Sequence, residues 1–481
     1  MKATVMLVSS LISLIMILPA LSLPVSADGF SYVRPSPQEQ WGPLKEVGQY
    51  AMISHDGKIQ KMILSISIKN TDLLNSQGLV WIFPIPSAAI DARIEVLSNV
   101  TQFDGGAASD SINRSLAGDY SLIYGSQLFL LPFSYALTVD IKPDPYYPYG
   151  GYLGFGSTGS AGKGSNEPAV DIVEHIESHG LTTELISAED NQAIYEYLTD
   201  VGLTPTAGLL EALDGYNSSE YSFVISWVNN PNEILSGPHQ YDYQQGYNYY
   251  SIGIYVEFPC QMIYFPMKLT SMYGHDVKIP IVLQITGFVG APEADEMMLD
   301  SLGAKEKYFV QDGYEFDTDL SDFFFDVYSQ SEIADGKLQT LKYTEIRMDG
   351  YADYMTDDIW VPLNPPLKEM SMSFLVDNHF IFTIFILAIA SMLASLIGAM
   401  IVYREQSPEK ARFAILGLAN LATIVGLVIA AYKLKINSRF VQDESGEATE
   451  KGIGIYLFSF IMLFVLFASV SQAFVALALG L

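Results

Sequence analysis

Three long apolar runs near the C-terminal end of the chain constrain its fold more than any other feature. They cover Phe380–Tyr403, Phe413–Tyr432 and Ile455–Leu477, and none of them contains a charged side chain. Each run has about 20 residues or more, which at about 1.5 Å per helical residue is enough to cross the roughly 30 Å hydrocarbon core of a bilayer. We therefore expect three transmembrane helices in this part of the chain.

The N-terminal residues have the pattern of a secretory signal peptide. Lys2 precedes a long apolar run, and Val25-Ser26-Ala27 provides the small residues that cleavage requires. We expect cleavage after Ala27, with an uncleaved membrane helix as the alternative. Either way, the chain from Asp28 to the first apolar run lies outside the cell, and we predict a multi-pass protein of the cell membrane with a large external domain. Both loops between the apolar runs carry Lys and Arg, so their charge does not orient them independently.

The charge balance excludes some partners. Among 481 residues, 54 are acidic and 25 are basic, which gives a formal net charge of −29. Nucleic-acid binding depends on Lys and Arg that neutralise phosphates, so we expect no nucleic-acid partner. The acidic surface fits either attraction of cations or adaptation to salt. Cys260 is the single cysteine, so the chain has no internal disulfide, and we expect Cys260 to be a small buried side chain.

The first exported part, residues 28–142, reads as β-rich. Asp56-Gly57 is the two-residue turn signal of a hairpin, and apolar residues alternate along the strand that follows it. The stretch GLVWIFPIPS is too short to span a membrane. We interpret it as a core strand that ends at Pro84 and Pro86, because proline cannot donate a hydrogen bond to a neighbouring strand.

The second exported part follows a linker, residues 143–168, that is rich in Gly, Tyr, Pro and Ser. In residues 169–365 we expect two strands around Gly180, then a helix with Ser187 as its N-cap that ends at Gly202, and further strands. The stretch WVPLNPPL, residues 360–367, is expected to approach the membrane as a stiff extended stalk, and residues 366–379 are the juxtamembrane stalk. The predicted fold class is therefore α+β, with β-rich exported domains followed by a bundle of three transmembrane helices.

The order of these motifs resembles a secreted prokaryotic family called domain of unknown function 2330. The residues that carry the resemblance are the proline-ended strand Val80–Pro86, the strand–helix unit Leu185–Gly202 and the strand Tyr264–Ser271. It covers roughly residues 28–290, and this chain lacks the early cysteines of many bacterial members. The resemblance implies an exported β-rich architecture in a prokaryotic envelope. It implies no reaction, cofactor or site residue.

Two kinds of polar sites are candidates in the exported part. Asp317, Asp319 and Asp322 are carboxylates at a spacing that can hold calcium, although the EF-hand pattern fails around them. The alternative is a solvated acidic face, and apart from this calcium we expect no cofactor. Glycosylation sequons occur at Asn99, Asn113 and Asn217. His175 and His179 stand four residues apart, but no third zinc ligand is identifiable, so a solvated strand is the preferred interpretation.

Small residues recur every four positions in two of the predicted membrane helices. Residues at that spacing let helix backbones approach each other in lipid. Asn420 lies well inside the second helix, where a polar side chain is expected to face protein. The predicted helix-packing residues are Ala390, Ala394, Gly398, Asn420, Ala422, Gly426 and Ala430.

The Ser, Asp and His residues do not occur at the spacings of a known catalytic motif, so we name no catalytic residue. We favour a non-catalytic surface binding or assembly component, and the tyrosine-rich stretch of residues 239–250 fits a binding surface for a glycan or a protein. One alternative is an enzyme on the outer face, such as a metal-dependent hydrolase. Another is an accessory subunit whose membrane helices form a homo-oligomer or a complex.

Overall fold

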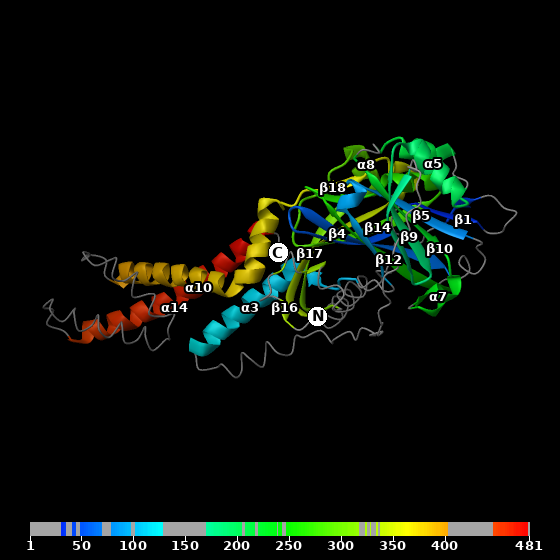
Figure 1. Cartoon of the computed structure of the whole chain (residues 1–481). Helices are drawn as coiled ribbons and strands as arrows, with labels where there is room; N and C mark the ends of the chain where they lie inside the picture. Colours follow the sequence, from blue (N-terminus) through cyan, green and yellow to red (C-terminus); the bar gives the residue numbers. More distant parts are fainter. Residues whose placement is uncertain are drawn as a thin grey trace, which may run out of the picture. The chain divides into compact units, whose positions relative to one another are not determined.

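The computed structural model describes residues 30–34, 41–44, 49–69, 78–97, 102–127, 170–203, 207–216, 220–237, 239–242, 247–316, 323–324, 328, 333–334, 337–402 and 446–479 (Figure 1). The chain forms two compact units. The first consists of residues 1–104, 151–307 and 312–364, and the second of residues 105–150, 308–311 and 365–481. The structure is α+β with large β-sheets, as predicted from the sequence.

A six-stranded antiparallel sheet lies in the first unit. Its strand order is β2 (Gly42–Pro43), β1 (Phe30–Arg34), β5 (Gly78–Ile85), β10 (Ser222–Val228), β9 (Leu181–Ala188) and β8 (Val170–Ser178). Strands β1, β2 and β5 come from the first predicted exported part, and the other three come from the second. The two parts therefore share one sheet.

A larger sheet follows the order β11 (His239–Asp242), β12 (Tyr247–Pro259), β4 (Ile59–Lys69), β3 (Gln49–His55), β14 (Lys278–Thr286), β17 (Lys337–Tyr351) and β15 (Lys305–Glu315). Strand β6 (Arg93–Leu97) pairs with β12, and β16 (Ile333–Ala334) pairs with β17. Strands β3 and β14 run parallel, and the other pairings described in this sheet are antiparallel. Apolar side chains from both sheets, among them Trp81 and Met62, belong to one core cluster.

Short elements complete the first unit. Strand β13 (Ile263–Phe265) pairs with β18 (Ile359–Val361). The helices are α5 (Asn191–Asp200), α6 (Ala207–Leu213), α7 (Pro231–Ser236) and α8 (Glu296–Leu302), and the 3₁₀ turns are η2 (Ala89–Asp91), η3 (Lys268–Tyr273) and η5 (Ala352–Tyr354). Three side chains of α5 are buried, Ala193, Ile194 and Leu198, so the apolar face of this helix faces the core.

Local sequence signals explain several of these elements. The hairpin of β3 and β4 forms around Asp56-Gly57, with Gly57 at φ 97°, and the Asp56 carboxylate accepts hydrogen bonds from the Lys58 and Ile59 amides. Strands β8 and β9 turn at His179 and Gly180, both of which have positive φ. These predictions of turns from Gly and Asp are confirmed.

Other predicted boundaries are wrong. Strand β5 does not end at Pro84 but continues to Ile85, where β10 is its only remaining neighbour, because pairing with β1 ends at Ile82. A proline is tolerated where one side of the strand is unpaired. The N-cap of α5 is Asp190 and not Ser187, because the Asp190 carboxylate accepts the Ala193 amide at 2.8 Å. Residues 362–366 of the expected extended segment are non-helical, and α10 begins at Leu367.

The described part of the second unit contains the helices α3 (Ala108–Gln127), α10 (Leu367–Val402) and α14 (Gly446–Leu479). Strand β7 (Gly106–Ala107) precedes α3 and pairs with residues 309–310. Helix α10 bends at Asn378, which has non-helical φ and ψ, immediately before the apolar run begins. Helix α3 was not predicted from the sequence.

Among the described residues, one helix is long and apolar enough to cross a membrane, Leu367–Gly398. It contains most of the first predicted transmembrane run. The third predicted run lies within α14, whose apolar stretch Phe458–Ser471 falls among the described side chains. The second predicted run, Phe413–Tyr432, lies outside the described residues. The described residues therefore contain one membrane-length helix, and the second predicted span stays a prediction.

Candidate functional site

One buried carboxylate of the first unit is Asp358, which precedes β18. One of its carboxylate oxygens accepts hydrogen bonds from the Tyr216 hydroxyl at 3.0 Å and from the Met267 and Lys268 amides at 2.8 Å. The other oxygen accepts the Tyr264 hydroxyl at 2.8 Å. Burial raises the pKa of Asp358, and the four donors act in the opposite direction by stabilising the carboxylate.

The surroundings of Asp358 are aromatic and closed to solvent. Tyr264 packs against Trp360, and Tyr216 packs edge-on against Tyr221. Burial raises the pKa of Tyr221 to about 12, so its hydroxyl stays protonated at neutral pH. Every oxygen of Asp358 already has protein partners. The arrangement therefore joins four chain segments and acts as a structural centre.

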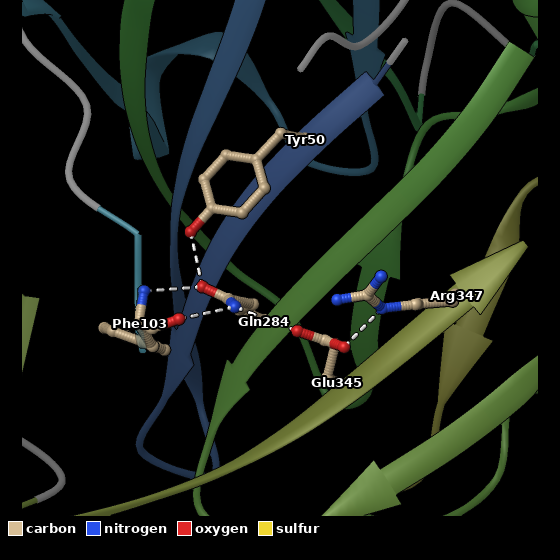
Figure 2. A network of polar contacts seen from close by, with 5 residues as sticks. All are labelled: Tyr50, Phe103, Gln284, Glu345 and Arg347. Atoms are coloured by element: carbon tan, nitrogen blue, oxygen red, sulfur yellow. Dashed lines mark hydrogen bonds and ion pairs between the residues drawn. The ribbon is translucent and has the colours of Figure 1, made fainter. Parts of the chain in front are cut away.

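A second buried network centres on Gln284 in β14 (Figure 2). Its side-chain oxygen accepts the Tyr50 hydroxyl at 2.6 Å and the Phe103 amide at 2.7 Å. Its nitrogen donates to the Phe103 carbonyl and to Glu345, each at 3.0 Å. Figure 2 shows that Glu345 is also contacted by Arg347, whose side chain is half exposed. The network thus fixes the loop at Phe103 to the sheet and leads from the core to the surface.

A third cluster reaches the surface and combines an imidazole, a carboxylate and a phenol. His175 of β8 stands directly opposite Glu184 of β9, and its Nδ1 lies 2.6 Å from one carboxylate oxygen of Glu184. The hydroxyl of Tyr197 in α5 donates to the other oxygen. Glu184 is buried, whereas 45% of the His175 side chain is exposed. Burial, together with the contact to Glu184, raises the pKa of Tyr197.

This arrangement gives His175 a fixed orientation. Its Nε2 lies 3.6 Å from a carboxylate oxygen of Glu177. The half-exposed imidazole of His175 therefore stands between the buried carboxylate of Glu184 and the exposed carboxylate of Glu177. We regard His175, Glu184 and Tyr197 as the candidate polar site of the first unit.

The second unit has its own buried carboxylate. Asp119 of α3 lies against α10, where its Oδ2 is 2.7 Å from Nδ1 of His379 and accepts the Thr383 hydroxyl at 3.3 Å. Thr383 is fully buried and Asp119 is 8% exposed. An ionisable group beside an apolar helix is costly unless it is paired. The pair ties α3 to α10 at the bend beside Asn378.

Three of the predicted packing residues lie between α10 and α14. Ala390, Ala394 and Gly398 are buried, and Ala390 and Ala394 share a core cluster with Phe460 and Phe464 of α14. A Cβ on Gly398 would lie 3.5 Å from the Tyr456 ring. The hydroxyls of Ser395 and Tyr456 are 2.6 Å apart. Small residues thus occupy the surface where these two helices meet.

The other predicted site residues have mixed outcomes. The calcium candidates Asp317, Asp319 and Asp322 lie outside the described residues, and calcium binding stays a prediction. Asn113 is exposed on α3, while the sequons at Asn99 and Asn217 fall outside the described part. The remaining packing residues, Asn420, Ala422, Gly426 and Ala430, are outside it too. Within the described ranges, no three His, Cys, Asp or Glu side chains are placed to hold a metal ion.

Two of the candidate residues were missed in the sequence. Glu184 was identifiable, because a hairpin turning at His179-Gly180 pairs positions 178 and 181, and continuing that pairing brings 175 opposite 184. No local sequence pattern indicated a partner for Asp119. Asp119 reaches His379 only because α3 packs along α10, and 260 positions separate the two residues.

Comparisons with known proteins do not assign the chain to a family. No protein-family model matches the sequence, and no curated protein matches it. Among solved structures, a mutated baculovirus P35 after caspase cleavage is similar at a TM-score of 0.26 and 8% sequence identity, over 66% of this chain and 100% of that chain. A likeness at that TM-score carries no argument about fold or function.

Proposed function

We propose that this chain is a membrane-anchored exported protein that displays its first unit outside the cell as a non-catalytic binding or assembly component of a prokaryotic envelope. The outside placement rests on the signal-peptide pattern, and the prokaryotic host rests on the family resemblance. The attachment to a membrane rests on helix α10.

The surface of α10 is the observation that carries the proposal. Phe380, Ile381 and Phe385 are 43%, 66% and 62% exposed, and Ile389 and Leu393 continue this apolar surface. The opposite side of the helix is buried at Thr383, Leu387 and Ala390. Soluble proteins rarely expose large contiguous apolar surfaces, so lipid is the environment that fits this helix.

The tyrosine-rich hairpin of the first unit is the proposed binding surface. The hairpin of β11 and β12 lies at one end of the larger sheet, with His239 opposite Tyr250 and Gln240 opposite Tyr249. This is the tyrosine-rich stretch, and tyrosine provides rigid contact area with little entropic cost. A surface glycan or a protein partner fits such a hairpin.

Membrane fractionation and native assembly test the proposal together. We expect the full chain to stay in the membrane after alkaline carbonate extraction, and protease added to intact cells to degrade the first unit. Release by carbonate would overturn membrane anchoring, and protection from external protease would overturn the outside placement. In mild detergent, a species heavier than one chain supports an assembly role, whereas a lone chain contradicts it.

A further inference from the structure

Helices α10 and α14 run in opposite directions. Late residues of α10 meet the early part of α14, because Ser395 and Gly398 contact Tyr456. Further along α14, Phe464 and Ala468 join the cluster that contains the earlier α10 residues Leu387 and Ala390. In Figure 1 the colour of α10 changes from yellow to orange in the direction opposite to that in which α14 reaches its C-terminal red. The two helices are therefore antiparallel.

Helix α14 also presents an apolar outer face. Its exposed large side chains are Ile455, Phe458, Ile461, Met462, Val465, Leu466 and Val470, each between 45% and 67% exposed. No charged residue occurs from Ile455 to Leu477, and at about 1.5 Å per residue this length covers roughly the 30 Å of a hydrocarbon core. The face matches the uncharged interior of a bilayer, and it continues the apolar surface of its partner α10.

We propose that the outer face of α14 contacts lipid acyl chains and that α14 crosses the bilayer antiparallel to α10. This inference rests on the proposed function, in which α10 carries the chain from outside to inside. Val402 and Gly446 then lie on the inner side, and Leu479 returns to the outer side with the first unit. A parallel arrangement of α10 and α14 is contradicted by the contact of Ser395 with Tyr456 together with the cluster that joins Leu387 and Ala390 to the later α14 residues.

Single-cysteine labelling of the full chain tests this order. In a Cys260→Ser background, cysteine replaces Glu369 before the apolar part of α10, Glu447 at the start of α14, or Leu479 at its end. Intact cells are treated with a membrane-impermeant maleimide, and lysed cells provide the matched control for reactivity. We expect labelling of Glu369→Cys and Leu479→Cys in intact cells, and labelling of Glu447→Cys only after lysis.

The outcomes separate this inference from the proposed function. If Glu447→Cys is labelled in intact cells and Leu479→Cys only after lysis, the helices cross in parallel and the inference is overturned. If both α14 positions behave alike, α14 does not cross the bilayer and the inference fails while α10 still spans. If Glu369→Cys is labelled only after lysis, the first unit is not outside and the proposed function fails instead.

Discussion

Nδ1 of His379 lies 2.7 Å from a carboxylate oxygen of Asp119, and this contact joins α3 to the beginning of the apolar part of α10. Thr383, one turn further, donates to the same oxygen. Because Asp119 is buried, its two partners lose a hydrogen bond that water cannot easily replace when the carboxylate is removed. The pair is therefore a buried hydrogen-bonded contact that holds α3 against α10 in the described part of the second unit.

Asp119→Ala should loosen α3 without unfolding the first unit. We expect the protection free energy of the α3 amides to fall by about 1–3 kcal/mol, the usual cost of leaving buried partners unsatisfied. Hydrogen exchange of the full chain in nanodiscs measures this. Asn113→Ala, an exposed change on the same helix, is the matched control. Equal exchange in the two variants would show that the pair contributes nothing to the docking of α3.

Gln284→Leu should destabilise the first unit strongly. It removes the partner of the Tyr50 hydroxyl, the Phe103 backbone and Glu345 at once, and each buried group left unsatisfied costs about 1–3 kcal/mol. We expect a total loss of about 2–5 kcal/mol. All four tryptophans lie in the first unit, so denaturation followed by tryptophan fluorescence reports on this unit.

The control for Gln284→Leu is Lys278→Ala. Lys278 forms an exposed ion pair with Asp349, and exposed pairs contribute about 0–1 kcal/mol. If Gln284→Leu lowers the free energy of unfolding no more than Lys278→Ala does, water replaces the hydrogen bonds of Gln284 and the network does not stabilise the unit.

His55 should make the first unit sensitive to mild acid. Its Nδ1 accepts the Gly57 amide at 2.8 Å, and its Nε2 lies 3.0 Å from the Cys260 carbonyl, so the neutral ring fits this site. Burial lowers the pKa of His55 below its ordinary 6.5. The unfolded chain therefore takes up the proton at a higher pH than the folded one, and stability is lost as pH falls below about 6.5 towards the folded pKa.

A second histidine acts in the opposite direction. The contact with Asp353 raises the pKa of His275, so its contribution is present below 6.5 and is lost as pH rises through the folded pKa. We therefore compare His275→Asn with the double variant His55→Gln and His275→Asn. The single variant should lose stability between pH 7 and pH 5 and the double variant should lose less. Identical slopes would exclude a contribution from His55.

Local patterns predicted local structure well. Asp56-Gly57 and Gly180 fixed two hairpins, because positive φ and a short polar side chain are properties of the turn residues themselves. The alternation along β4 placed Met62 and Leu64 in the core, but it wrongly predicted a wetter opposite face, because Lys61, Ile63 and Ser65 are buried as well. The register around Gly180 even contained the pairing of His175 with Glu184, although the sequence reading did not use it.

Long-range features were not predictable in the same way. The sharing of both sheets by the two exported parts depends on pairings such as Val224 with Phe83, and no local pattern selects that partner. The position of Asp119 beside His379 depends on packing between helices far apart in sequence. Apolar length predicted that α10 can span a bilayer, but the direction of α14 relative to it required the contact of Ser395 with Tyr456.

Ala394→Leu with Gly398→Leu should separate α10 from α14. Both positions are buried at the helix contact. A Cβ atom at Gly398 would already lie 3.5 Å from the Tyr456 ring and 3.6 Å from the Phe460 backbone. Leucine extends well beyond that carbon, and overpacking of a close contact typically costs about 1–3 kcal/mol. The readout is crosslinking with a short bismaleimide between Ser395→Cys and Tyr456→Cys in a Cys260→Ser background, measured in native membranes.

The parent pair should crosslink efficiently, because the hydrogen-bonded Ser395 and Tyr456 side chains place the two positions opposite each other across the helix contact, within reach of a bismaleimide. The double leucine variant should reduce crosslinking several-fold. Leu393→Phe, which enlarges a residue that is 42% exposed on the outer face of α10, should leave it unchanged. A second pair, Ser395→Cys with Ala468→Cys, should give little crosslinked product. These two positions would come together only if the helices were parallel. Strong crosslinking of that second pair, or unchanged crosslinking in the double leucine variant, would show that α14 does not pack against α10 through Ala394 and Gly398.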